Sequence, residues 1–199
     1  MKSDIYTLYG NGEGIEEALE AAENVAAYAK LGKKEALQLR LLAEELTGIM
    51  RGIVGDFEAQ YWIEKEENTY QLHLASEMHL NDVEKDKLLE VSTSGENTIS
   101  GGIMAKIGHF FREAIENYNQ SMINYPQADM LLYKNAGMVN ANISTFTWSL
   151  REYKQHVEEE AQGREWDELE KSIVANLADD VSVCINGKNI EIVIKKTFK

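Results

Sequence analysis

Residues 37–53 read LQLRLLAEELTGIMRGI, and the spacing of the apolar side chains in this stretch decides the fold. Leucine and isoleucine recur every three or four residues, which is the period of one helical face. The members of that stripe are Leu39, Leu42, Leu46, Ile49 and Ile53. Leu41 and Met50 widen the apolar face, so we expect a central core helix that begins near Lys33.

The segments on either side of this helix have different periods. On the N-terminal side, residues 5–9 predict a short edge strand, and a helix begins at Ile15 after the turn GNGEG and ends at Gly32. On the C-terminal side, apolar and polar residues alternate over 57–63 and again over 70–74, with KEENT between them. This period of two predicts a β-hairpin.

The second half of the chain holds a lid-like loop, further helices and a second hairpin. Residues 81–102 are polar, and a helix is expected from about Gly102 to Tyr118. We interpret 119–163 as a helical insertion with helices near 127–135 and 141–161, and we expect another helix over 166–177. The closing hairpin pairs Val181, Val183 and Ile185 with Ile190, Ile192 and Ile194 around NGKN.

Hairpins with helices between them favour one fold class. We expect a single α+β domain over 1–199, a two-layer sandwich in which a mostly antiparallel sheet carries helices on one face.

Composition and charge exclude several kinds of partner. The chain is 44% hydrophobic and 27% charged, with no apolar run long enough to cross a membrane. The start, MKSDIYTLYGNGEG, lacks the apolar core of a signal peptide, so a cytoplasmic location is expected. A net charge of −14 disfavours nucleic acid and anionic membranes. A protein or small-molecule partner remains.

Most familiar site motifs are missing. The turn GNGEG lacks the G-x-G-x-x-G spacing, and Glu13, Glu16 and Glu17 occupy the helix start where a phosphate would bind. The four histidines show no metal-binding spacing, so no metal site is expected. His73 should lie opposite Leu72 and Leu74 and be exposed. Cys184 is expected to be a small residue in a strand.

The stretch 37–53 resembles the N-box helix of the Bergerat-fold (GHKL) ATP-binding superfamily, closest in layout to the anti-sigma serine kinases. The resemblance puts Glu44 at the position of the general base, Gly48 at that of the magnesium-chelating Asn, and Arg51 at the helix end. Ser76 or Glu77 falls near the adenine-reading Asp. Gly101, Gly102 and Lys106 fall in the second glycine box, where the lid leads into a helix and Lys106 lies one turn into that helix. The closing hairpin matches the family's last two strands.

The resemblance implies ATP and Mg²⁺ as cofactors, but several motif positions differ from the family pattern. Gly48 supplies no oxygen ligand for magnesium, and the glycines beside the adenine-reading position are missing. We therefore expect a cytoplasmic signalling or regulatory protein with a degenerate ATP-binding fold that acts by binding a protein partner. The partner classes left open are a sigma factor, its antagonist and a second copy of the chain.

Two other functions are weighed beside this one. The first is a working ATP-dependent serine kinase of the anti-sigma type, in which Glu44 is the base. The second is a scaffold or oligomerisation domain with no ligand. Gly48 and Gly52 each cost about 1 kcal/mol relative to alanine in a helix interior, so two of them in one core helix indicate a packing reason, such as the close approach of another element, or a ligand reason.

Overall fold

A computed structural model describes residues 1–54, 57–77, 107–108, 110–111, 113–114, 145–160, 172–186 and 189–199. The predicted lid at 81–102 lies outside the described residues, as do most of 119–163 and the stretch 166–171. Within the described part, Ile107, Phe111 and Ala114 are helical and buried, as the sequence predicted.

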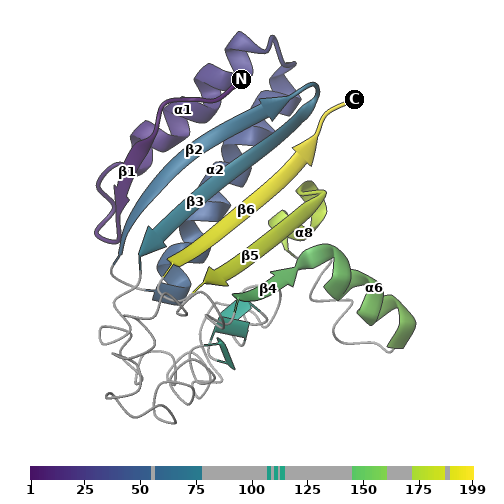
Figure 1. Ribbon diagram of the computed structural model, residues 1–199. Coiled ribbons are helices and arrows are strands. Elements are labelled where there is room, and N and C mark those ends of the chain that lie inside the picture. Colours follow the sequence, from purple (N-terminus) through teal and green to yellow (C-terminus); the bar gives the residue numbers. More distant parts are fainter. Residues whose placement is uncertain are drawn as a thin grey trace, which may run out of the picture.

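The described elements follow the predicted order, with one additional strand (Figure 1). In chain order the described elements are β1 Tyr6–Tyr9, α1 Ile15–Tyr28, α2 Lys33–Val54, β2 Glu58–Glu66, β3 Thr69–Glu77, β4 Thr145–Ser149, α6 Leu150–Glu160, α8 Ile173–Leu177, β5 Asp180–Asn186 and β6 Asn189–Thr197.

The six strands of the described residues form one antiparallel sheet in the order β1-β2-β3-β6-β5-β4. The two predicted hairpins, β2–β3 and β5–β6, are both present, and β1 is an edge strand as expected. The centre of the sheet is the pairing of β3 with β6, which runs from Thr69 opposite Thr197 to Glu77 opposite Asn189. This pairing joins the two halves of the chain into one sheet.

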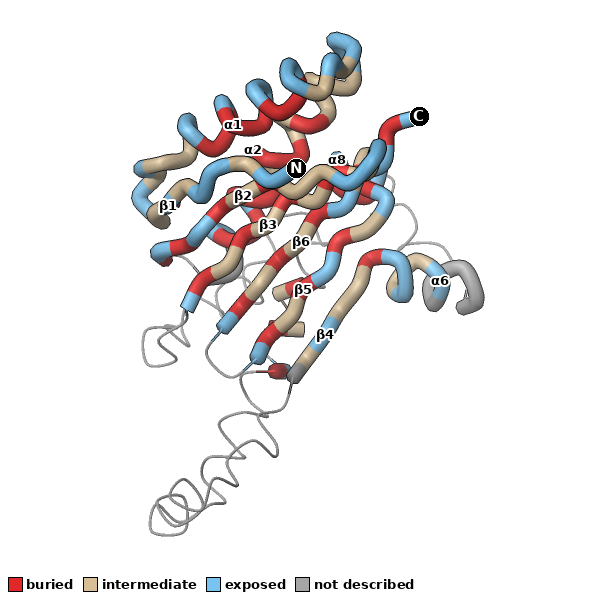
Figure 2. Tube along the Cα trace, turned by 45° about the horizontal axis from the view of Figure 1, so that its top comes forward, coloured by how far each residue is buried: buried red, intermediate tan, exposed pale blue. Residues whose placement is uncertain are grey.

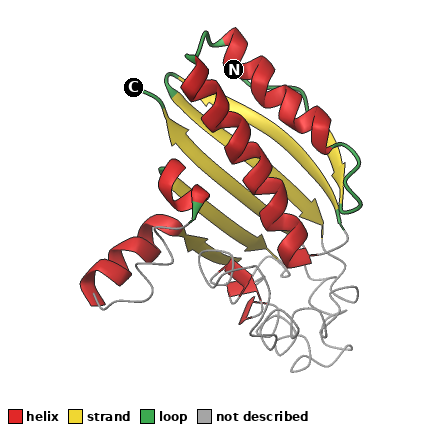
Figure 3. Cartoon of the chain, turned by 180° about the vertical axis from the view of Figure 1, so that it is seen from behind, coloured by secondary structure: helices red, strands yellow, loops and turns green. Residues whose placement is uncertain are grey.

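The helices α1 and α2 cover one face of the sheet (Figure 3). α2 packs on β3 and β6, and α1 lies against β1 and β2. Arg40 of α2 ties the two helices together through Glu16, at 3.3 Å, and Glu23, at 2.6 Å, on α1. The chain is therefore an α+β two-layer arrangement, which confirms the coarse prediction.

The core lies between these two layers, where buried positions alternate along the strands (Figure 2). Tyr61 and Ile63 of β2 are buried, whereas their neighbour Gln60 is exposed. The predicted stripe of α2 is buried at the four positions whose side chains are described, which are Leu39, Leu42, Leu46 and Ile49. The period of 3.6 in α2 and the period of 2 in β2 therefore place the apolar side chains of both elements at the same interface.

The predicted helix over 141–161 is wrong for its first described part. Residues Thr145–Ser149 form the strand β4, which pairs with β5 at the edge of the sheet, and the helix α6 begins only at Leu150. The sequence TFTWS is rich in β-branched and aromatic residues, and pairing with β5 satisfies its backbone groups. The hydroxyl of Ser149 then accepts a hydrogen bond from the Glu152 amide at 3.2 Å and caps the helix.

None of the helices described here has both the length and the apolar character required to span a bilayer.

Candidate functional site

The residues Glu44, Gly48 and Arg51 lie on the solvent-facing side of α2. All three are exposed, while Ala43, Leu46 and Thr47 beside them are buried. A spacing of four and three residues places the three positions on one helical face. The structure therefore aligns them along the helix, but on the side turned away from the sheet.

The neighbouring acid has a different environment. Glu45 is partly buried, and burial together with the nearby Glu44 carboxylate raises its pKa. The pair Glu44–Glu45 is therefore not a uniformly solvated face, because Glu44 is exposed and Glu45 is partly withdrawn from water.

Gly48 does not serve a close approach between elements within the described part of the chain. A Cβ built on Gly48 would meet no described atom within 4 Å. The packing explanation considered for this glycine is therefore wrong for the described residues.

Gly48→Ala is expected to raise the free energy of unfolding by about 0.5–1 kcal/mol, because the added methyl group points into open space and alanine is the better helix former. Urea denaturation followed by circular dichroism measures the change. A loss of stability would contradict the open environment of Gly48.

Ser76 and Glu77, the candidates for contacting adenine, point to opposite faces of β3. Ser76 is 8% exposed on the face that carries the helices, and its hydroxyl donates a hydrogen bond to the Glu58 carbonyl at 2.7 Å. Glu77 is exposed at the strand end. The hydroxyl of Ser76 is thus already used within the sheet, and Glu44 on the outer side of α2 does not converge with it.

Arg51 lies beside the turn between β1 and α1. Its Nη2 would be 3.4 Å from a Cβ at Gly12. In that turn the Glu13 amide donates to the Asn11 side chain at 2.9 Å, and Gly14 precedes the helix with φ 83°. The GNGEG segment is a turn that leads into α1, as interpreted from the sequence. Gly101, Gly102 and Lys106 lie outside the described residues.

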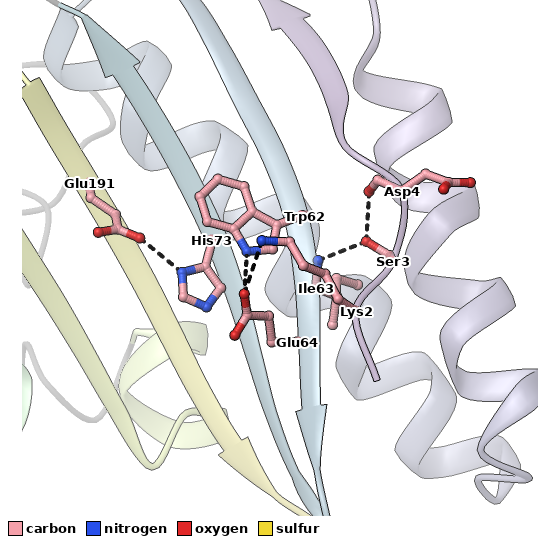
Figure 4. A network of polar contacts seen from close by, with 8 residues as sticks. All are labelled: Lys2, Ser3, Asp4, Trp62, Ile63, Glu64, His73 and Glu191. Atoms are coloured by element: carbon pink, nitrogen blue, oxygen red, sulfur yellow. Dashed lines mark hydrogen bonds and ion pairs between the residues drawn. The ribbon is translucent and has the colours of Figure 1, made fainter.

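A second group of polar residues, on the opposite face of the sheet, was not found by sequence reasoning (Figure 4). The ring of Trp62 on β2 stacks on that of His73 on β3, with centroids 4.7 Å apart and planes 8° apart. Nδ1 of His73 lies 2.9 Å from Oε1 of Glu191 on β6. The His73 side chain is only 12% exposed, so the prediction that it is exposed is wrong, although its assignment to this face is right.

The group continues toward the N-terminal segment through Glu64. Oε1 of Glu64 accepts a hydrogen bond from Nε1 of Trp62 at 3.0 Å and lies 3.1 Å from Nζ of Lys2. The same ammonium lies 4.5 Å from the centroid of the Trp62 ring. The hydrogen bonds from Lys2 and then Trp62 lower the pKa of Glu64, so its carboxylate is held in the charged form. We call Lys2, Trp62, Glu64, His73 and Glu191 the open-face network.

The thiol on this face is not activated as a nucleophile. Cys184 on β5 lies opposite Glu191, and burial, followed by this carboxylate, raises the pKa of the thiol. No cluster of three or more His, Cys, Asp or Glu side chains suited to a metal ion occurs among the residues that the structure describes.

Comparison with known proteins gives no match to a family model, to a curated protein or to a solved structure.

Proposed function

We propose that this protein is a cytoplasmic signalling or regulatory protein that acts by binding a protein partner, on a Bergerat-like fold whose ATP site is degenerate. Support for the fold comes from the order of elements: a long helix with Glu44, then a hairpin, and a hairpin at the end of the chain. Fold alone does not fix function, so the case depends on the residues of the site.

The observation that carries the proposal is the hydrogen bond of Ser76. A hydroxyl that donates to the Glu58 carbonyl at 2.7 Å and is nearly buried is not available to read an adenine. Gly48 adds no oxygen for Mg²⁺, and Glu44 points to solvent on the far side of α2. These residues do not converge on one nucleotide.

Electrostatics favours a cationic protein as the partner. The net charge of −14 attracts basic surfaces and speeds their association. The proposal keeps a sigma factor, its antagonist and a second copy of the chain as the partner classes; a second copy carries the same net charge of −14, so its binding would depend on contacts other than net charge attraction.

One observation favours the second candidate function, an ATP-dependent serine kinase of the anti-sigma type. Glu44 and Arg51 share an exposed face of α2, where a ligand could reach both. In such a kinase Glu44 would take the proton from the attacking hydroxyl.

Calorimetric titration with ATP and ADP, with and without Mg²⁺, separates the two functions. We expect no magnesium-dependent binding to the full chain. Micromolar binding that requires Mg²⁺, together with phosphoryl transfer that is lost in Glu44→Ala but kept in the neighbouring control Glu45→Ala, would replace the proposal with the kinase.

A further inference from the structure

We propose that Trp62 and Glu64 form a recognition site for a lysine or arginine side chain of a basic partner segment, and that Lys2 of the same chain occupies this site in the free protein. The inference rests on the proposed function, because it names the chemistry by which a protein partner is recognised. It concerns the sheet face opposite the helices and involves none of the predicted nucleotide-binding residues.

The position of Lys2 shows what the site accepts. Its ammonium meets an aromatic ring at 4.5 Å and a carboxylate oxygen at 3.1 Å. A ring face and a carboxylate at these distances are the two groups that stabilise an organic cation, through the ring quadrupole and through a charge-assisted hydrogen bond. An arginine would gain further, since its planar guanidinium stacks on tryptophan and pairs with a carboxylate.

The site is organised before any ligand arrives. Stacking on His73 fixes the plane of the Trp62 ring, and the contact between His73 and Glu191 holds the imidazole from the next strand. The indole N–H, donated to Glu64, fixes the carboxylate relative to the ring. A rigid site binds more tightly because little side-chain freedom is lost on binding.

The Lys2 side chain is held weakly enough to be displaced. Its ion pair with Glu64 is exposed, at 49% for Lys2 and 42% for Glu64, and exposed pairs of this kind contribute little to stability. The backbone is anchored separately, because the Ser3 amide donates to the Ile63 carbonyl at 2.9 Å and the Lys65 amide donates to the Met1 carbonyl at 2.8 Å. The flexible side chain can therefore leave while the backbone stays paired.

The surface next to the site suits a cationic segment. A shallow concavity of about 400 Å³ is lined by Met1, Lys2, Glu64, Lys65, Glu66 and Gln71. The Lys65 ammonium donates to the Glu67 carbonyl and lies 5.7 Å from the Tyr70 ring. Lys195 of β6 lies opposite Gln71 of β3 on one side and opposite Asp180 of β5 on the other, so one of its two neighbours across the sheet is acidic. Once Lys2 is displaced, Glu64 and Glu66 outnumber Lys65 among the lining residues, which favours a cationic ligand over an anionic one.

The test uses the full chain and two short peptides, Ac-Gly-Arg-Gly-Arg-Gly-amide and its glutamate counterpart. Binding is followed by the NMR signal of the Trp62 indole N–H, assigned with Trp62→Phe. Lys2→Ala is expected to bind the arginine peptide about three- to tenfold more tightly than the unsubstituted protein, because the competing side chain is gone. Adding Glu64→Gln to Lys2→Ala is expected to reverse this gain.

Lys65→Ala is the matched control, because it removes a positive charge beside the site without emptying it. An equal gain in Lys2→Ala and Lys65→Ala, or full binding after Glu64→Gln, would show general charge attraction and overturn the proposal. Binding of the glutamate peptide as tight as that of the arginine peptide would also overturn the proposal. Since ATP binding is measured separately, a positive nucleotide titration would refute the proposed function and leave this result unaffected.

Discussion

Leu46→Ala is expected to lower the free energy of unfolding by about 2–5 kcal/mol, the range measured when a buried leucine is truncated and the cavity only partly closes. Leu46 is fully buried in the middle of α2, the helix that packs on the two central strands β3 and β6. The lost contacts therefore belong to the interface between the layers. Urea denaturation monitored by circular dichroism gives the value.

Leu37→Ala is the matched control, because it makes the same substitution in the same helix. Leu37 is 57% exposed, so we expect its truncation to change stability by no more than about 0.5 kcal/mol. Helix propensity cancels between the two variants, and their difference reports burial alone. Similar losses for both would mean that α2 does not face the sheet as described.

Gly14→Ala is expected to cost about 2–4 kcal/mol of stability, for two reasons that act together. The residue has a φ of +83°, in the left-handed region that alanine adopts only with strain. A Cβ at this position would also come within 2.1 Å of the Thr7 carbonyl oxygen, so the backbone of β1 or of the turn would have to move. Thermal and urea unfolding both measure the loss.

Gly12→Ala separates the two causes. Gly12 has a φ of +102°, but a Cβ there would contact only the Arg51 side chain, at 3.4 Å. We expect Gly12→Ala to lower the free energy of unfolding by about 1 kcal/mol, from backbone strain alone. If Gly14→Ala were no worse than Gly12→Ala, the close approach of β1 to the start of α1 would be wrong.

Part of the open-face network could have been found from the sequence. β2 ends at Glu66 and β3 begins at Thr69, so the loop is Glu67–Asn68, and Glu67 has a φ of +52°. A two-residue hairpin loop fixes the register of both strands, which puts Trp62 opposite His73. Locating KEENT as a turn, without fixing its two loop residues, left this pair unnoticed.

The remaining members of the site could not be found in that way. Glu191 is 118 positions from His73, and Lys2 reaches Glu64 only because the N-terminal segment pairs beside β2. Likewise, the residues around Ser76 in the sequence do not indicate that its hydroxyl donates a hydrogen bond to the Glu58 carbonyl across the hairpin. The resemblance of 37–53 to an N-box helix could place residues along the chain but not the directions of their side chains.

By itself, the sequence determined the helices α1 and α2, the two hairpins and the face that each buries. Those features depend on periods of 3.6 and 2 within consecutive residues, so a short window of sequence is enough to predict them. Tertiary structure alone decided that β3 lies beside β6, that Thr145–Ser149 is an edge strand and that His73 contacts Glu191. Each of these depends on contacts between segments that are distant in sequence. The free energy of such contacts cannot be inferred from the pattern of consecutive residues.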